Sequence, residues 1–231
     1  MKKIIGILML LCAFQVTAQS NSELLKHYEA YYNQMKSQGD VQGVINALTH
    51  LNILQPNQAR KDTLSAYYMN EGKHVQALNV IGIDVNENDS DLALEVKAVS
   101  LKALNEVERA IQQYEILYKR KRTVMTAYEL ADLKIQANDL AGASLNITYG
   151  LANSPSDIGR TYYEAQVPYQ VPIKAGFLYL KGLALFRENP QSNIEAAIIL
   201  FDEAIAMAPN FNLALISKEA LTSKLNETKK E

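Results

Sequence analysis

Four small or β-branched residues recur along this chain at one fixed interval, and that interval restricts the fold more than any other feature. They lie 33 residues apart, at Val44, Ala77, Ala110 and Ala143. A large apolar residue follows each anchor by four positions (Leu48, Ile81, Tyr114, Ile147), and a Gly or Asn precedes each by five (Gly39, Gly72, Asn105, Asn138). Ala197 and Phe201 repeat the four-residue offset later. A fixed period of this length predicts an array of repeated structural units.

Each unit is predicted to be a helical hairpin. Apolar-periodic stretches lie on both sides of the Gly or Asn, and these two residue types tolerate the positive φ of a tight turn. Pro56, Pro155 and Pro209 each fall twelve residues after an anchor. Because Pro cannot continue a helix, each of them ends a second helix. A small residue at the anchor lets the two helices cross closely.

This pattern resembles the tetratricopeptide repeat, and the last unit matches it best, with Gly182, Ala197, Phe201, Ala204 and Pro209. Asp84, Asp89 and Arg122 depart from the family's small or Pro residues. The resemblance implies an all-α, right-handed superhelical solenoid of about five hairpins plus a C-terminal capping helix. The expected single domain covers 19–226, with units at about 22–56, 57–89, 90–122, 123–155 and 173–209, an insertion at 156–172, a capping helix at 213–225 and a polar tail at 227–231.

The first residues predict export. Two lysines precede an apolar stretch from Ile4 to Phe14, and Val16-Thr17-Ala18 has the small-x-small form of a signal peptidase site. We expect a signal peptide over 1–18, cleavage after Ala18, and a periplasmic or secreted protein. Lipoprotein acylation at Cys12 is disfavoured, because Leu11 is not the small residue that a lipobox requires.

Composition restricts the kinds of partner. The chain is 48% hydrophobic and 21% charged, as expected for a globular protein, and its formal net charge of -2 argues against nucleic acid as a partner. After the leader, no apolar run reaches the roughly 20 residues of a membrane-spanning helix. The count of 13 Tyr is high, and Tyr suits half-buried positions and interfaces.

The insertion at 156–172 breaks the helical period. Pro168 and Pro172 favour extended or turn conformations, although a short helix around Arg160–Glu164 is a second interpretation. The insertion carries three tyrosines, Tyr162, Tyr163 and Tyr169. Either they form an exposed contact surface, or they pack back on the repeats and plug the groove.

No catalytic or metal-binding constellation is found in the sequence. The three His residues have no metal-ligand spacing, and there is no Gly-rich phosphate loop. Asn88-Asp89-Ser90-Asp91 lacks the Gly and distal Glu of a calcium loop and is interpreted as a helix cap. We therefore expect a protein that is not an enzyme and needs no cofactor.

The family resemblance implies that the first helix of each unit lines a concave groove for a protein or peptide partner. Together with the insertion tyrosines, the residues carried into this groove are Glu29, Asn33, Asp62, Asn70, Tyr128, Asp132, Tyr179 and Phe186. Glu29, Thr63 and Val96 argue against the family's carboxylate clamp. We expect a scaffold or adaptor of the bacterial cell envelope that binds a neutral or basic segment. The alternative is a small-ligand or nutrient-binding accessory protein that uses the Tyr-rich insertion. The sequence leaves homo-oligomerisation open.

Overall fold

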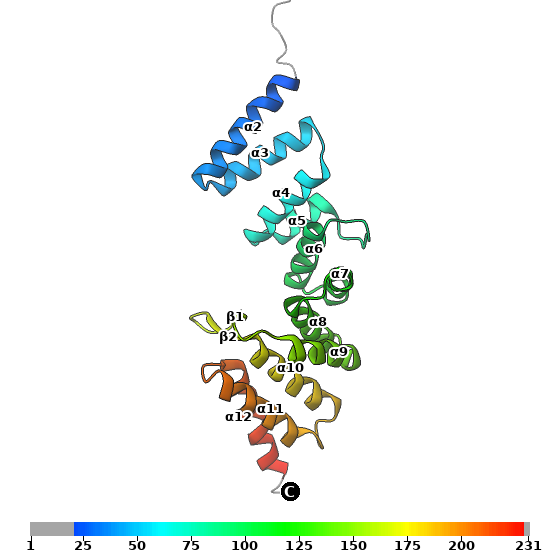
Figure 1. The fold of residues 1–231 in the computed structure, drawn as a ribbon, viewed down its shortest axis with the longest axis vertical. Helices are drawn as coiled ribbons and strands as arrows, with labels where there is room; N and C mark the ends of the chain where they lie inside the picture. Colours follow the sequence, from blue (N-terminus) through cyan, green and yellow to red (C-terminus); the bar gives the residue numbers. More distant parts are fainter. Residues whose placement is uncertain (1–20, 229–231) are drawn as a thin grey trace, which may run out of the picture. The chain divides into compact units, whose positions relative to one another are not determined.

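The computed structural model describes residues 21–228, which form helices α2–α12 and one two-stranded sheet (Figure 1). The predicted signal peptide lies outside these residues. The chain divides into two compact units, Met1–Ile83 and Asp84–Glu231. No helix within the described part of the chain is long and apolar enough to cross a membrane.

Unit 1 consists of two packed helix pairs in its described part. They are α2 (Asn21–Gln38) with α3 (Val41–Leu54), and α4 (Gln58–Asn70) with α5 (His74–Ile81). Its core includes Val44, Ile45 and Leu48 of α3 and Leu64 of α4. Helix α5 is short because Gly82, with φ +82°, ends it one residue after Ile81.

Unit 2 repeats the same pairing. Its pairs are α6 (Asp91–Ala103) with α7 (Val107–Arg120), α8 (Val124–Gln136) with α9 (Leu140–Asn153), and α10 (Ile173–Glu188) with α11 (Ile194–Met207). Helix α12 (Asn212–Thr228) packs against α11 and buries Ala214 and Leu221, which confirms the predicted helix at 213–225. The all-α repeat fold expected from the sequence is therefore present.

The turns inside the hairpins have the predicted chemistry. Gly39, Gly72, Asn105 and Asn138 all have positive φ, between 61° and 70°. The residue after each turn former donates its N–H to a carbonyl five positions back, as from Asp40 to Met35 at 3.0 Å and from Glu106 to Leu101 at 2.9 Å. This is the Schellman motif, which satisfies the last carbonyls of a helix and starts the return of the chain.

The small anchors lie where the two helices of a hairpin cross. Ala77, Ala110, Ala143 and Ala197 are fully buried, and Val44 is nearly so. In the last hairpin, a Cβ atom added at Gly182 would lie 2.6 Å from the ring of Phe201. The crossing is thus too close for a larger side chain, which explains the small residues that mark the repeat.

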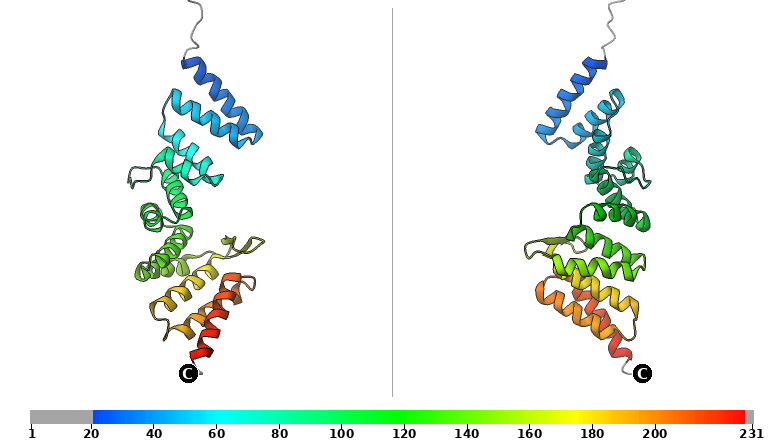
Figure 2. Two further views of the ribbon diagram at one scale, coloured as in Figure 1. Left: turned by 180° about the vertical axis from the view of Figure 1, so that it is seen from behind. Right: turned by 45° about the vertical axis from the view of Figure 1, so that its right-hand side comes forward.

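The insertion forms a β-hairpin between α9 and α10. Strands β1 (Gly159–Tyr162) and β2 (Tyr169–Pro172) pair antiparallel, and Figures 1 and 2 show them extending from the helices of unit 2. The interpretation of Arg160–Glu164 as a short helix is wrong, because Arg160 and Tyr162 pair with residues of β2. Pro168 and Pro172 favour extended backbone, and the observed strands agree with this first interpretation of the insertion.

Candidate functional site

In unit 1, the structure brings together two of the four predicted groove residues. Glu29 and Asn33 are exposed on α2 and line a pocket of about 370 Å³, whose opposite wall includes Arg60 and Thr63 of α4. Asp62 is buried and accepts a hydrogen bond from Gln58 at 2.8 Å. Asn70 is exposed at the end of α4 and does not line this pocket.

In unit 2, four charged side chains meet on the first helices and the insertion hairpin. Glu129 of α8 accepts from Lys102 of α6 at 2.6 Å and from Arg160 of β1 at 2.6 Å. Lys102 also donates to Asp132 at 3.0 Å. We call Lys102, Glu129, Asp132 and Arg160 the charge cluster. It ties three elements that are distant in sequence to one face of the unit.

Glu129 and Lys102 of the charge cluster are held in their ionised forms. Burial by itself would raise the pKa of Glu129, but the Lys102 and Arg160 charges together outweigh burial and lower it. Burial would likewise lower the pKa of Lys102, and the nearby carboxylates of Glu129 and Asp132 raise it instead. Each partly buried charge thus depends on its partners for compensation.

The hairpin covers the predicted groove residue Tyr128 with its own Arg160 and Tyr162. The guanidinium of Arg160 lies 4.0 Å from the ring centroid of Tyr128, and the hydroxyls of Tyr128 and Tyr162 are 2.7 Å apart. Tyr128 is 2% exposed and Tyr162 is 8% exposed. Burial raises the pKa of both hydroxyls, so both remain neutral donors and acceptors. Both rings pack in the hydrophobic core of unit 2.

The remaining predicted aromatics are divided between the core and the surface. Tyr179 is buried beside Phe201 and Phe211. Phe186 is half-buried, with the Lys224 ammonium 5.1 Å from its ring. Tyr169 stacks on Tyr162 and donates its hydroxyl to Glu164, whereas Tyr163 is 75% exposed. Of the insertion tyrosines, therefore, only Tyr163 offers a free ring, and the other two pack back on the repeats.

A pocket of about 380 Å³ adjoins the charge cluster. Its lining includes Glu95 and Val99 of α6, Tyr114 of α7 and Glu129 of α8. Glu95 is exposed and forms no ion pair within the described residues. Burial first, and then the Glu129 and Glu95 carboxylates, raise the pKa of the Tyr114 hydroxyl. The pocket therefore presents an unpaired carboxylate beside an aromatic ring, which suits a cationic or amide-bearing side chain.

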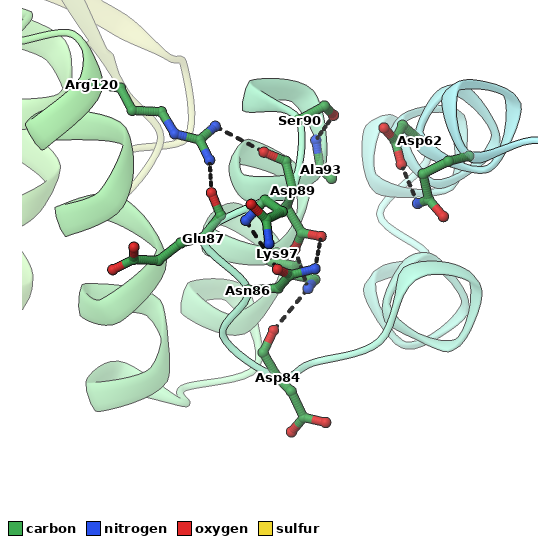
Figure 3. Close-up of polar contacts among 11 residues, drawn as sticks. Asp62, Asp84, Asn86, Glu87, Asp89, Ser90, Ala93, Lys97 and Arg120 are labelled. Carbon is green, nitrogen blue, oxygen red and sulfur yellow. Dashed lines mark hydrogen bonds and ion pairs between the residues drawn. The ribbon is translucent and has the colours of Figure 1, made fainter.

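The polar loop before α6 is occupied by its own cation (Figure 3). The Lys97 ammonium is buried and donates to the Asp84 carbonyl at 2.8 Å and the Asp89 carboxylate at 2.5 Å. Arg120 donates to the carbonyls of Glu87 and Asp89. The loop's acceptors are thus used internally. The predicted helix cap is confirmed, since the Ser90 hydroxyl accepts from the Ala93 N–H at 3.0 Å.

Sequence comparisons with known proteins yield no relative: no family model matches, and no curated protein matches. Several solved structures match this chain in fold. The APC/C hetero-tetramer Cut9–Hcn1 matches at 15% identity with a TM-score of 0.53, over 89% of this chain but only 36% of that one. The chain has a tetratricopeptide-like fold.

Two further tetratricopeptide structures match. A tetratricopeptide repeat protein from Parabacteroides merdae is 16% identical, with a TM-score of 0.46 over 92% of this chain and 75% of that one. The TPR2AB domain of yeast Sti1, solved in complex with pHSP90, is 13% identical, with a TM-score of 0.35 over 89% and 86%.

Sequence reasoning missed Glu129 and Arg160, the two central members of the charge cluster. Glu129 follows Tyr128 and lies outside the repeat positions that the tetratricopeptide pattern directs into a groove. Arg160 lies in the insertion, for which the repeat provides no template. Arg160 is the only basic residue of the Tyr-rich insertion, which was the available signal, but this does not indicate which residue Arg160 contacts.

Proposed function

We propose that this protein is a non-enzymatic scaffold of the bacterial cell envelope that binds a neutral or basic segment of a partner protein on its first-helix faces. The observation that carries the proposal is the pocket beside the charge cluster, where Glu95 is exposed and unpaired among the described residues. A Lys or Arg of the partner would find a carboxylate there, with Tyr114 beside it.

The same repeat position supports this proposal in unit 1. Glu29, Asp62 and Glu95 are 33 residues apart, so the repeat places an acid at one position of three successive first helices. Asp62 is buried, but Glu29 and Glu95 each line a pocket of their own unit. Repeated exposed acids favour a basic partner segment, because opposite charge both attracts the segment and selects against acidic competitors.

The neighbouring charges refine the expected partner. Within the charge cluster, Asp132 and Lys102 satisfy one another, which leaves that part of the face nearly neutral. Half-buried Phe186 is the more accessible of the two predicted groove aromatics on α10. We therefore infer a segment with one or two basic residues and at least one apolar anchor.

The test is capture from an envelope extract with the tagged chain from Gln19 onward, run beside charge-reversal variants. We expect one discrete protein partner that Glu95→Lys releases, with salt-sensitive recovery. Glu108→Lys is the matched control, because it makes the same charge change at an exposed position of α7, the second helix of its hairpin. Equal recovery by Glu95→Lys and Glu108→Lys would remove the pocket from the binding site, and capture of no protein would contradict the scaffold itself.

Cell fractionation tests the proposed localisation in the envelope. Fractionation of the native cell should recover the chain with the periplasmic or secreted proteins, beginning at Gln19. A cytoplasmic chain that retains its first residues would contradict the envelope assignment.

A further inference from the structure

The register of the insertion hairpin determines which main-chain groups face outward. The paired residues are Gly159↔Pro172, Arg160↔Val171, Thr161↔Gln170 and Tyr162↔Tyr169. Next to this ladder, the Ile173 N–H donates to the Ile158 carbonyl at 2.9 Å. Antiparallel pairs that exchange hydrogen bonds alternate with pairs that exchange none. The pair Ile158↔Ile173 is therefore hydrogen-bonded, and the pairs that contain Gly159 and Thr161 are not. The N–H and C=O groups of Gly159 and Thr161 consequently point to the outer edge of β1.

The outer edge of β2 is closed to a further strand. Pro172 occupies an outward-facing position and has no N–H to offer. The carbonyl of Gln170, at the other outward-facing position, accepts from the Asn210 side chain at 3.4 Å. Pro168, just before the strand, also lacks an N–H. Proline and covering contacts of this kind are how natural sheets prevent pairing at an edge.

The outer edge of β1 has no such protection. Gly159 is half-buried and has no side chain, and Thr161 is exposed. Within residues 21–228, no hydrogen bond reaches the outward N–H or C=O of either residue. The views in Figures 1 and 2 show the hairpin projecting from the helices of unit 2. An edge with unpaired donors and acceptors is a template for another strand.

The geometry points to strand addition: an extended segment of the partner protein pairs with the outer edge of β1 as a third strand. This inference rests on the proposed function for the existence of a partner, and it adds the partner's conformation and docking edge. Main-chain hydrogen bonds to Gly159 and Thr161 supply the pairing. Because the outward groups of Gly159 and Thr161 lie along one strand edge, an extended chain is the conformation that satisfies both residues at once.

The side chains of β1 define the sequence that such a segment needs. Successive residues of a strand face opposite sides. Arg160 and Tyr162 are directed to α8, where they contact Glu129 and Tyr128. Thr161 therefore lies on the opposite, exposed side, and Tyr163, the first residue after the strand, is also exposed. The segment should alternate, with β-branched or aromatic residues beside Tyr163 and polar or basic residues toward the charge cluster.

A second copy of this chain fits the edge less well. Pairing of β1 with β1 would use only the outward groups of Gly159 and Thr161 from each copy. Stable interfaces bury about 1,200–2,000 Å² in total, far more than two such short edges provide. A partner segment that pairs with β1 and also reaches the Glu95 pocket would enlarge the contact without a second hairpin.

The test uses short random peptides displayed on phage and selected on the chain from Gln19 onward. We expect selected peptides with alternating apolar and polar or basic residues. Thr161→Pro should weaken their binding about tenfold, because it removes one outward N–H and places a ring at the edge. Gln170→Pro is the matched control: it removes an outward N–H from β2 instead, and binding should be unchanged. Equal loss in both variants, or no selected peptide, would overturn strand addition.

A measurement on the unaltered protein guards against a misfolded variant. The Thr161 amide should exchange rapidly with deuterium in the free chain and become protected when a selected peptide binds. A Thr161 amide that stays unprotected at saturation would refute the docking edge. If Glu95→Lys weakens binding while Thr161→Pro does not, strand addition fails and the groove scaffold stands. Concentration-dependent dimers abolished by Thr161→Pro would assign the edge to a second copy and overturn the partner assignment.

Discussion

Two hairpins of unit 1 and the first two of unit 2 share the same backbone turn, but the two units fill their interiors differently. The core of unit 1 includes the aliphatic residues Val44, Ile45 and Leu48. The core of unit 2 includes Phe177, Phe201 and other rings in edge-on and tilted contact. Because the turns are alike, the difference lies in side-chain burial and not in local backbone preference. Large rings contribute more buried apolar area per residue.

The second difference is ionic. Unit 2 ties its first helices to the insertion through Glu129, Lys102 and Arg160. In the described part of unit 1, Glu29 and Asn33 lie free on the surface of a pocket. We therefore expect unit 1 to open more readily than unit 2, because local stability follows buried contacts. The four predictions below test this comparison.

The largest expected effect is in the aromatic core. Phe201 is fully buried against Gly182 and Tyr179. Phe201→Ala should lower the free energy of unfolding of unit 2 by about 4 kcal/mol, through lost burial and a cavity. Urea unfolding followed by circular dichroism, with hydrogen exchange to localise the change, measures it. Half-buried Phe186→Ala is the control and should cost less. A Phe201→Ala effect confined to amides of unit 1 would contradict the comparison.

Removing the centre of the charge cluster should have the next largest effect. Glu129→Ala leaves Arg160 and Lys102 without their shared acceptor and should cost about 3 kcal/mol of unfolding free energy. Glu95 is exposed and forms no ion pair among the described residues, so Glu95→Ala should change stability by less than about 0.5 kcal/mol. The comparison is broken if the two variants unfold at the same urea concentration.

The pH dependence sharpens the ionic difference. The folded-state pKa of Glu129 lies below its ordinary value of 4.5, so its contribution is complete above that pH and is lost as pH falls through the lower folded value. Below pH 4.5, unit 2 should therefore lose at most about 1.4 kcal/mol per pH unit through this one group. Titration of unfolding free energy in the parent and in Glu129→Gln gives the measurement. Identical slopes in both proteins would exclude Glu129 as the responsible group.

The sequence was informative where structure repeats and where chemistry is local. The anchors and the turn formers Asn105 and Asn138 follow from helix crossing and positive φ, which depend on neighbouring residues alone. The candidate site was harder to predict from the sequence. Tyr128 occupies a groove position of its repeat, yet the insertion places Tyr162 and Arg160 over it. A non-repeating segment contacts residues that no period can indicate, so the repeat pattern alone could not decide whether Tyr128 is buried or faces an open groove.

The smallest effect concerns the one local difference between the units. The two hairpins of unit 1 turn on Gly39 and Gly72, whereas the first two hairpins of unit 2 turn on Asn105 and Asn138, all with positive φ. A Cβ atom at Gly72 would have no neighbour within 4 Å, so Gly72→Ala should cost about 1 kcal/mol from backbone conformation alone. Asn105→Ala should cost a similar amount and Asn105→Gly almost nothing, as measured by urea unfolding. If Gly72→Ala is neutral while Asn105→Ala is costly, the Asn side chain itself stabilises the turn, and the two units differ in their turns as well as in their cores.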